Sequence, residues 1–340
     1  MGLDWSFSTD RRMRRCPRQL FFADLAAWHN ARDPLRRESF LLSQLKSMEA
    51  WRGLVVHQAI QTLVVPCLQN HQPVDWDQVI CGALALAERQ FRFSAQRRYR
   101  EAGMSKRKAQ GDYSALFAHE FGMPIPVGQF QATLKSIEHA LCNLSRMSDF
   151  FRHVGGRNYY RPELAISAEY NGVRIKGQID LLFGRSYGKY SVVDWKDYEA
   201  LSGSDARLQM SLYAWLLCQS PSWPVSDPQN IELWEVKLGE GRTVCHTIDQ
   251  TSFDELEDFM YQRTEELRVF CGDGTYDPRD LDNYPHTDNP NSCRFCAYRN
   301  VCREPEPWIT TASISTKSKS PAASPLNTGW LISEVSTGLR

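Results

Sequence analysis

The chain has 340 residues, of which 42% are hydrophobic and 24% charged, so we expect a globular protein with one large core or two smaller ones. Its 40 basic residues balance its 40 acidic residues, and net charge therefore indicates no partner. No apolar run approaches the roughly 20 residues that cross a bilayer, and the polar, basic N-terminus predicts no secretory signal. We expect a cytoplasmic protein with no membrane partner, whose ten cysteines are reduced thiols or metal ligands. The chain lacks a Gly-x4-Gly-Lys-Ser/Thr loop, so we expect no ATP site.

The N-terminal segment combines a basic start with helical patterns. Cys16 follows a cluster of arginines, and Pro17 fits the first turn of a short helix. Apolar residues at spacings of three and four predict a helix over residues 38–70, which contains His57. A histidine in such a helix can be a core residue or a ligand that points toward a neighbouring sheet.

A second helical stretch, residues 76–101, leads into a basic run. Between residues 92 and 108 there are seven basic side chains and one acid, Glu101. Such a run is typical of a solvated face, and it can also contact nucleic-acid phosphates. A segment rich in glycine and proline, residues 122–128, precedes a further helix over residues 129–154.

The central segment predicts a hairpin that carries chemistry. Residues 173–181 alternate between apolar and polar, which predicts a half-buried strand with Asp180 on its polar face. Glycines at 184 and 188 indicate the turn. In the next strand, residues 190–196, Asp194 and Lys196 share one face because side chains two apart project together.

Paired strands would bring Asp180 and Asp194 close together. Two crowded carboxylates repel each other unless a cation neutralises them, and their hard oxygen ligands suit Mg2+ or Mn2+. Lys196 could orient or acidify a metal-bound water. Gln209 and Tyr213 follow at positions i and i+4 of a predicted helix and share a face. Taken alone, Asp-x-Lys on a strand is also typical of a surface ion pair.

Other elements extend this unit. A strand over residues 163–170 precedes it, and its Glu163 could be an accessory ligand, although the pattern favours a charge at the rim. Residues 231–238 and 242–248 predict two more strands, and residues 252–270 predict a helix.

Three cysteines near the C-terminus have the spacing of a metal centre. Cys293, Cys296 and Cys302 form Cys-x2-Cys-x5-Cys. A zinc ion would need a fourth local ligand such as His286, whereas a [4Fe-4S] cluster could be completed by the remote Cys16. We interpret the remaining six cysteines as core or surface thiols.

The order Gly-x-Ile-Asp, thirteen residues, Asp-Trp-Lys and Gln-x3-Tyr resembles the PD-(D/E)XK nucleases, in particular the RecB-like branch. The resemblance implies that Asp180 and Asp194 bind metal, that Lys196 serves the attacking water, and that Gln209 and Tyr213 support the site and the DNA strand. Asp194 stands where glutamate is common.

The resemblance also implies two further sets of ligands. The branch adds a metal-binding histidine on an upstream helix, which His57 matches, and the backbone carbonyl of Trp195 joins the metal ligands. Four cysteines in the pattern of Cys16, Cys293, Cys296 and Cys302 hold a [4Fe-4S] cluster in the iron-sulfur RecB-like nucleases, which include the AddB subunit and the CRISPR-associated RecB-like exonucleases. Such a cluster would join the two ends of the folded chain.

We therefore expect an α/β protein with a restriction-endonuclease-like mixed sheet flanked by helices. The expected parts are a helical N-terminal part at 1–160, a nuclease core at 161–270, an iron-sulfur segment at 271–303 and a mobile tail at 304–340. The expected activity is metal-dependent exonucleolytic cleavage of single-stranded DNA ends. The expected partners are DNA, as single strands or duplex ends, and a CRISPR integrase or a helicase. Alternatives are the trimming of prespacer ends for a CRISPR integrase, a non-cutting iron-sulfur DNA scaffold and a zinc-binding DNA adaptor.

Overall fold

The computed structural model describes residues 2–157, 159–186, 188–197, 203–223, 225 and 227–302. The described residues belong to one compact unit that ends at Cys302. The tail predicted over residues 304–340 lies outside the described residues. None of the helices described combines the length and the apolar character needed to cross a membrane.

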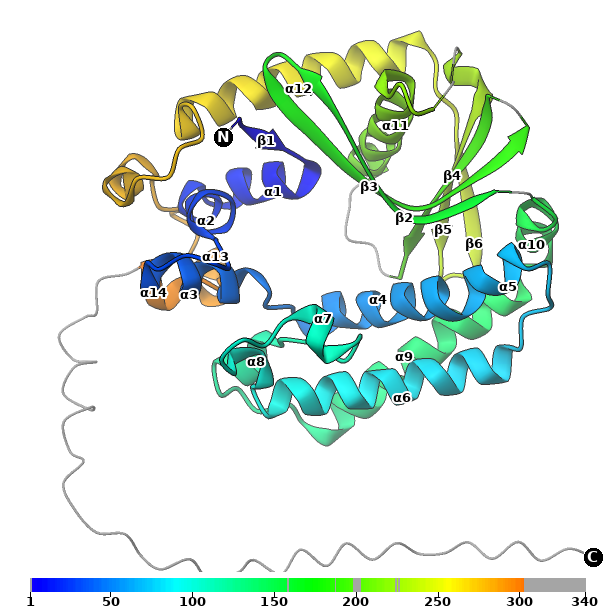
Figure 1. Ribbon diagram of the computed structural model, residues 1–340, viewed down its shortest axis with the longest axis horizontal. Helices are drawn as coiled ribbons and strands as arrows, with labels where there is room; N and C mark the ends of the chain where they lie inside the picture. Colours follow the sequence, from blue (N-terminus) through cyan, green and yellow to red (C-terminus); the bar gives the residue numbers. More distant parts are fainter. Residues whose placement is uncertain are drawn as a thin grey trace, which may run out of the picture. The chain divides into compact units, whose positions relative to one another are not determined.

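A mixed sheet organises the fold (Figure 1). Its described strands are β1 (Asp4–Trp5), β2 (Tyr160–Tyr170), β3 (Val173–Ser186), β4 (Lys189–Lys196), β5 (Ile231–Lys237) and β6 (Arg242–His246). One edge of β3 pairs with antiparallel β2 along its length. The other edge is shared, because parallel β1 pairs with its beginning and antiparallel β4 pairs with its end. The sheet continues through β5, parallel to β4, and antiparallel β6.

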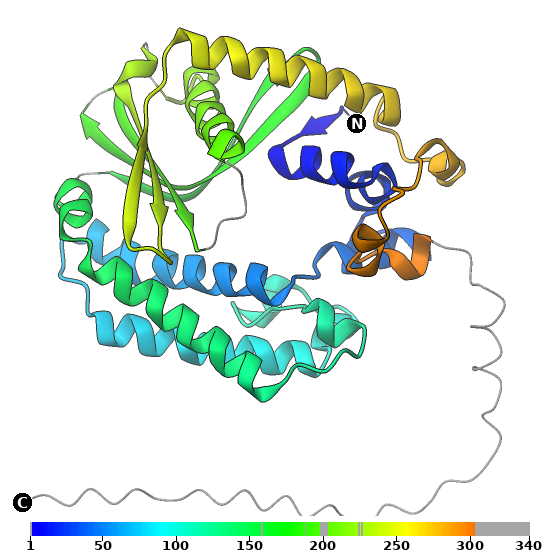
Figure 2. The same cartoon turned by 180° about the vertical axis from the view of Figure 1, so that it is seen from behind.

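Helices cover both faces of this sheet (Figures 1 and 2). On one face lie α11 (Gly203–Gln219) and α12 (Gln250–Cys271), and on the other lie α4 (Met48–Ala59), α6 (Trp76–Ala95) and α9 (Val127–Arg146). The other described α-helices are α1 (Phe7–Arg15), α2 (Pro17–Leu20), α3 (Pro34–Ser43), α5 (Val65–Gln69), α7 (Lys106–Ala109), α8 (Phe117–Glu120), α10 (Ser148–Val154), α13 (Pro290–Arg294) and α14 (Arg299–Cys302). The predicted mixed α/β class, with a sheet flanked by helices, is confirmed.

Two apolar cores hold the sheet between its helical layers. The first packs α11, α12 and the N-terminal aromatics Trp5, Phe21 and Phe22 against one face. The second packs Val55 and Val56 of α4 in one cluster with Leu181 of β3 and Val193 of β4. Burial of these side chains fixes α4 against the two central strands.

Three predicted elements differ in detail. The helix predicted over residues 38–70 breaks between α3 and α4, because Ser47 caps a new helix by accepting a hydrogen bond from the Ala50 amide. A π-helical turn, η2 (Ile60–Val64), then joins α4 to α5. The helix predicted over residues 129–154 breaks between α9 and α10 at Met147. Gly184 lies within β3, where it pairs with Tyr190, so the turn comes later than the sequence pattern indicates.

Candidate active site and cysteine cluster

The candidate active site lies where β3 and β4 separate. Their pairing runs from Ser186 back to Leu181, which is opposite Val193. Beyond that point the Asp180 side chain accepts a hydrogen bond from the Trp195 amide at Oδ2, 2.8 Å away. The Asp180 carboxylate thus accepts a hydrogen bond that a backbone carbonyl would accept in a regular pair of strands. The two strands diverge at Asp180 and Asp194, the two predicted metal ligands.

His57 of α4 reaches this point from the opposite layer. Its Nδ1 lies 3.6 Å from Asp180 Oδ1 and its Nε2 lies 3.0 Å from the Trp195 carbonyl oxygen. Burial by itself lowers the pKa of His57, but the negative charges of Asp180, Asp194 and Glu163 outweigh it and raise the pKa to about 9. At neutral pH the imidazolium therefore supplies the positive charge that the crowded carboxylates require.

Glu163 of β2 is part of the same group. One ligand atom each from His57, Glu163 and Asp180 lies within 4.8 Å of the others. Glu163 has a left-handed backbone with φ of 50°, and Gln178 donates a hydrogen bond to its Oε2 at 2.8 Å. Burial, with Asp180 nearby, raises the pKa of Glu163. The sequence pattern favours a rim charge, whereas the unusual backbone lets this side chain join the site.

Asp194 and Lys196 form an ion pair beside this group. Asp194 is 2% exposed, and its Oδ2 lies 2.5 Å from Lys196 Nζ. Asp194 is not within the tight group of His57, Glu163 and Asp180, although the sequence places it among the metal ligands. Burial raises the pKa of Asp194, and the charge of Lys196 offsets part of this rise.

The predicted helix residues complete a hydrogen-bonded chain. Gln209 of α11 accepts from Lys196 Nζ at 3.3 Å and donates to the Tyr213 hydroxyl at 2.7 Å. Tyr213 donates to Asp194 Oδ1 at 3.4 Å. Burial and the acid charges raise the pKa of Tyr213 well above its usual value, so the hydroxyl remains a donor at neutral pH. The structure thus brings together all five residues predicted from the sequence as catalytic.

A glycine allows α11 to approach this closely. A Cβ at Gly177 would lie 2.7 Å from Leu216 Cδ1 and 3.4 Å from the Tyr213 ring. The glycine of Gly-x-Ile-Asp is therefore needed for close packing of α11 against β3.

One further contact, missed by sequence reasoning, ties α4 to the end of β4. Arg52 Nε lies 2.5 Å from Asp197 Oδ2, and the Asp197 side chain is almost fully buried. Because Arg52 precedes His57 on α4 and Asp197 follows Lys196, this ion pair holds the two halves of the site together. The residues are 145 positions apart, so no local pattern predicts the pair.

The four predicted cluster cysteines also come together. Cys16 lies between α1 and α2, while Cys293, Cys296 and Cys302 lie at α13 and α14. Burial raises the pKa of Cys296 to about 11, and the neighbouring Cys302, Cys16 and Cys293 add to this rise.

Arg18 fastens the two ends of the chain at this point. Its guanidinium donates to the carbonyl oxygens of Tyr284, at 3.0 Å, and Cys302, at 3.4 Å. His286 Nδ1 lies 3.8 Å from Cys302 Sγ, so an imidazole is also available there.

A mixed sheet that diverges at two aspartates, with an adjacent lysine and histidine, defines a centre suited to metal-dependent phosphodiester chemistry. The profile of the PD-(D/E)XK nuclease superfamily matches residues 4–303, and the chain therefore belongs to that superfamily. Divalent metal use is a property of this superfamily, and the group of His57, Glu163 and Asp180 is a possible metal site.

Similar solved structures are more distant. A protein of Eubacterium rectale described as a "Putative exonuclease" is 13% identical, with a TM-score of 0.32 over 66% of this chain and 86% of its own. The structure of SSO0001 is 12% identical, with a TM-score of 0.28 over 64% of this chain and 93% of its own. No protein with curated annotation matches significantly.

Proposed function

We propose that this protein is a divalent-metal-dependent exodeoxyribonuclease that acts on single-stranded DNA ends and contains a structural [4Fe-4S] cluster. The observation that carries the proposal is the convergence of His57, Asp180 and Glu163 within 4.8 Å, beside the Asp194–Lys196 ion pair, in a PD-(D/E)XK chain.

The donor atoms fit Mg2+ or Mn2+. Carboxylate oxygens and an imidazole are ligands for these ions, and an array of nearby acids is stable only with positive charge among them. In our proposal His57, Asp180, Asp194 and the Trp195 carbonyl hold the metal, with Glu163 as an additional ligand. When bound, the ion would supply an activated water and neutralise charge on the phosphate.

The chain's own residues have distinct roles around that ion. Lys196, held between Asp194 and Gln209, orients the attacking water and stabilises its negative charge. Tyr213 and Gln209 are positioning residues, since their hydrogen bonds fix Asp194 and Lys196. Because these contacts come from β4 and α11, the lysine is ordered before substrate arrives.

The cysteines fit an iron-sulfur cluster. Four thiols from both chain ends match the four-cysteine ligand set of a [4Fe-4S] cluster. A tetrahedral zinc ion with bonds of about 2.3 Å would draw its sulfur ligands to within about 4 Å of one another. Among the described residues, no three of these sulfurs approach within 4.8 Å, and metal analysis of the purified protein decides between the two centres. The cluster would join α1 and α2 to α13 and α14.

The cysteine pattern also supports a narrower proposal, in which the chain trims prespacer ends for a CRISPR integrase. Co-purification of an integrase with the tagged protein would support it. A non-cutting DNA scaffold and a zinc adaptor are the other outcomes that the next experiment distinguishes.

The test uses anaerobically purified protein, metal analysis and strands labelled at either end. We expect a brown protein with about four iron atoms per chain that degrades single-stranded DNA with Mn2+ or Mg2+ and loses activity with a chelator. Asp180→Ala and Lys196→Ala should abolish degradation with the fold intact, whereas Glu88→Gln, at an exposed acid on α6, should not change it. Unchanged activity in both site variants would refute the site, and zinc without iron would refute the cluster.

A further inference from the structure

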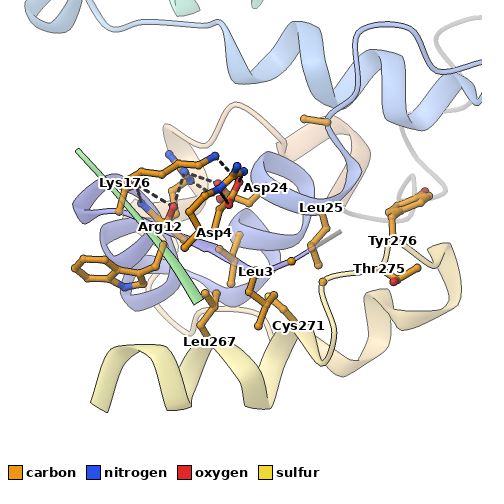
Figure 3. Close-up of a pocket in the computed structure, with 18 of the residues that line it drawn as sticks. Leu3, Asp4, Arg12, Asp24, Leu25, Lys176, Leu267, Cys271, Thr275 and Tyr276 are labelled. Atoms are coloured by element: carbon orange, nitrogen blue, oxygen red, sulfur yellow. Dashed lines mark hydrogen bonds and ion pairs between the residues drawn. The ribbon is translucent and has the colours of Figure 1, made fainter. Parts of the chain in front are cut away.

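A cavity of about 930 Å3 lies between the N-terminal segment, β3 and the C-terminal end of α12. Figure 3 shows the charged ends of Arg12, Asp4, Asp24 and Lys176 gathered at one side of it, with Tyr276 at the opposite side. Its size is within the range of ligand sites. The active-site residues described above do not line this cavity.

The polar face of β3 connects the cavity to the active site. Arg174, Lys176, Gln178 and Asp180 alternate with Ile175, Gly177 and Ile179 along the strand. Lys176 lies four residues before Asp180, about 13 Å along a strand. Between them, Gln178 bonds the proposed ligand Glu163. A substrate strand with its scissile phosphate at Asp180 would therefore pass Lys176 on its way to the cavity.

Most cations of the cavity are held by acids that a phosphate could replace. Asp4 pairs with both Lys176 and Arg174, the latter at 2.6 Å. Arg12 pairs with Asp24 at 2.6 Å. These acids fix the basic side chains in the absence of a ligand, and each pair is partly exposed.

Arg97, Arg98 and Arg100 of the basic run do not line this cavity, and they are paired with acids elsewhere. Arg97 and Arg100 pair with Glu120, and Arg100 also pairs with Glu38. Arg98 pairs with Glu101.

An aromatic surface completes the cavity. Trp28 is 39% exposed and lines it. The guanidinium carbon of Arg36 lies 5.9 Å from the Trp28 ring centroid and 4.6 Å from that of Tyr276. Exposed indoles next to cations are typical of surfaces on which bases of single strands stack.

We propose that this cavity binds the single-stranded segment of the substrate next to the scissile phosphate. Lys176 and Arg12 contact its phosphates, and Trp28 stacks on a base. The proposal rests on the proposed nuclease function, because it takes the direction of the strand from the metal site. It extends that function by assigning the single-strand preference to a defined surface.

The test measures binding separately from cleavage, by fluorescence anisotropy of labelled oligothymidylate with a chelator present. Lys176→Gln should weaken binding several-fold and reduce the slope of log affinity against log salt by about 0.7. Trp28→Ala should weaken binding about tenfold with no change in that slope. Lys135→Gln, at an exposed lysine on α9, is the matched control and should bind like wild type.

A variant that removes a negative charge from the cavity separates a binding role of these residues from a structural role. Asp4→Asn releases Lys176 and Arg174, so it should tighten binding, whereas loss of a structural ion pair would weaken it. Lys176→Arg should retain binding, and thermal melts should show each variant to be folded.

Wild-type affinity for both Lys176→Gln and Trp28→Ala, or weaker binding by Asp4→Asn, would overturn the proposal. If these binding effects appear but no variant or wild type cleaves DNA, the proposed function fails and the strand site stands. If the protein cleaves DNA but the binding effects are absent, the proposed function stands and the strand site fails.

Discussion

The candidate active site and the cysteine cluster both gather side chains from distant segments, but they are held in different ways. The active site lies between two apolar cores, and its charges are neutralised by His57 and Lys196. At the cysteine cluster the thiol pKa values of Cys296 and Cys302 are raised, so these groups are neutral at physiological pH. The charges of the first site are thus balanced by its own side chains, whereas we propose that the second site is completed by a bound cluster.

The largest expected effect follows from removing a cluster ligand. Cys296→Ser should lose the iron-sulfur absorbance and lower the melting temperature by roughly 10 °C, because ligand binding at such a site contributes folding free energy. Mn2+ affinity should change little, since none of the hydrogen bonds described at the active site involves the four cysteines. Cys81→Ser, at an exposed cysteine on α6, is the control. A variant that keeps its melting temperature would contradict the distinction between the two regions.

A larger side chain at Gly177 should affect the active site through the packing of α11 against β3. Gly177→Ala places a methyl group against Leu216 and Tyr213 of α11, and such overpacking costs about 1–3 kcal/mol. We expect a lower free energy of unfolding, measured in denaturant, and a lower turnover rate because Tyr213 moves with its helix. Gly128→Ala is the matched control, since open space surrounds that position. Equal effects of the two substitutions would show that the approach of α11 is unimportant.

The raised pKa of His57 predicts how metal binding depends on pH. Below about pH 9 the imidazole is protonated, and a metal ion must displace that proton to use it as a ligand. Mn2+ affinity should therefore rise about tenfold per pH unit between pH 6.5 and 9 and then level off. Calorimetry in buffers of different ionisation enthalpy should show about one proton released. No proton release at pH 7.5 would mean that His57 does not bind the ion.

The smallest expected effect concerns Glu163, the proposed additional ligand, which the sequence pattern favours as a rim charge. Glu163→Gln keeps the shape of the side chain but removes its charge, so Mn2+ affinity should fall about tenfold. The lost negative charge should also lower the pKa of His57, which an NMR titration of the imidazole can measure. Glu169→Gln, on the same strand, is a control, and an equal loss there would assign the effect to general surface charge.

The comparison also shows how far the sequence predicts the molecule. The alternation around Asp180 and Asp194 predicts the strands and the active-site face, because a period of two is a local property. The same alternation does not predict that Glu163 joins the site, because its left-handed backbone departs from the regular strand. The break before α4 depends on the cap at Ser47, which interrupts an otherwise continuous apolar pattern.

The sequence does not show which charged side chains form ion pairs when the two partners are far apart in the chain. The basic run containing Arg97 and Arg100 gives no sign that Glu120 and Glu38 neutralise it. Conversely, Asp4 and Lys176 are 172 positions apart in the sequence, and only the fold brings them into an ion pair.

The most direct test of the account locates the metal. Crystals soaked in Mn2+ should show an anomalous scattering peak at the manganese edge, bounded by the His57 imidazole, the carboxylates of Asp180 and Asp194, and the Trp195 carbonyl. Asp180→Asn crystals, in which the amide oxygen can still accept the Trp195 hydrogen bond, should lack the peak. A manganese peak elsewhere, or one that persists at this site in the Asp180→Asn protein, would contradict the account.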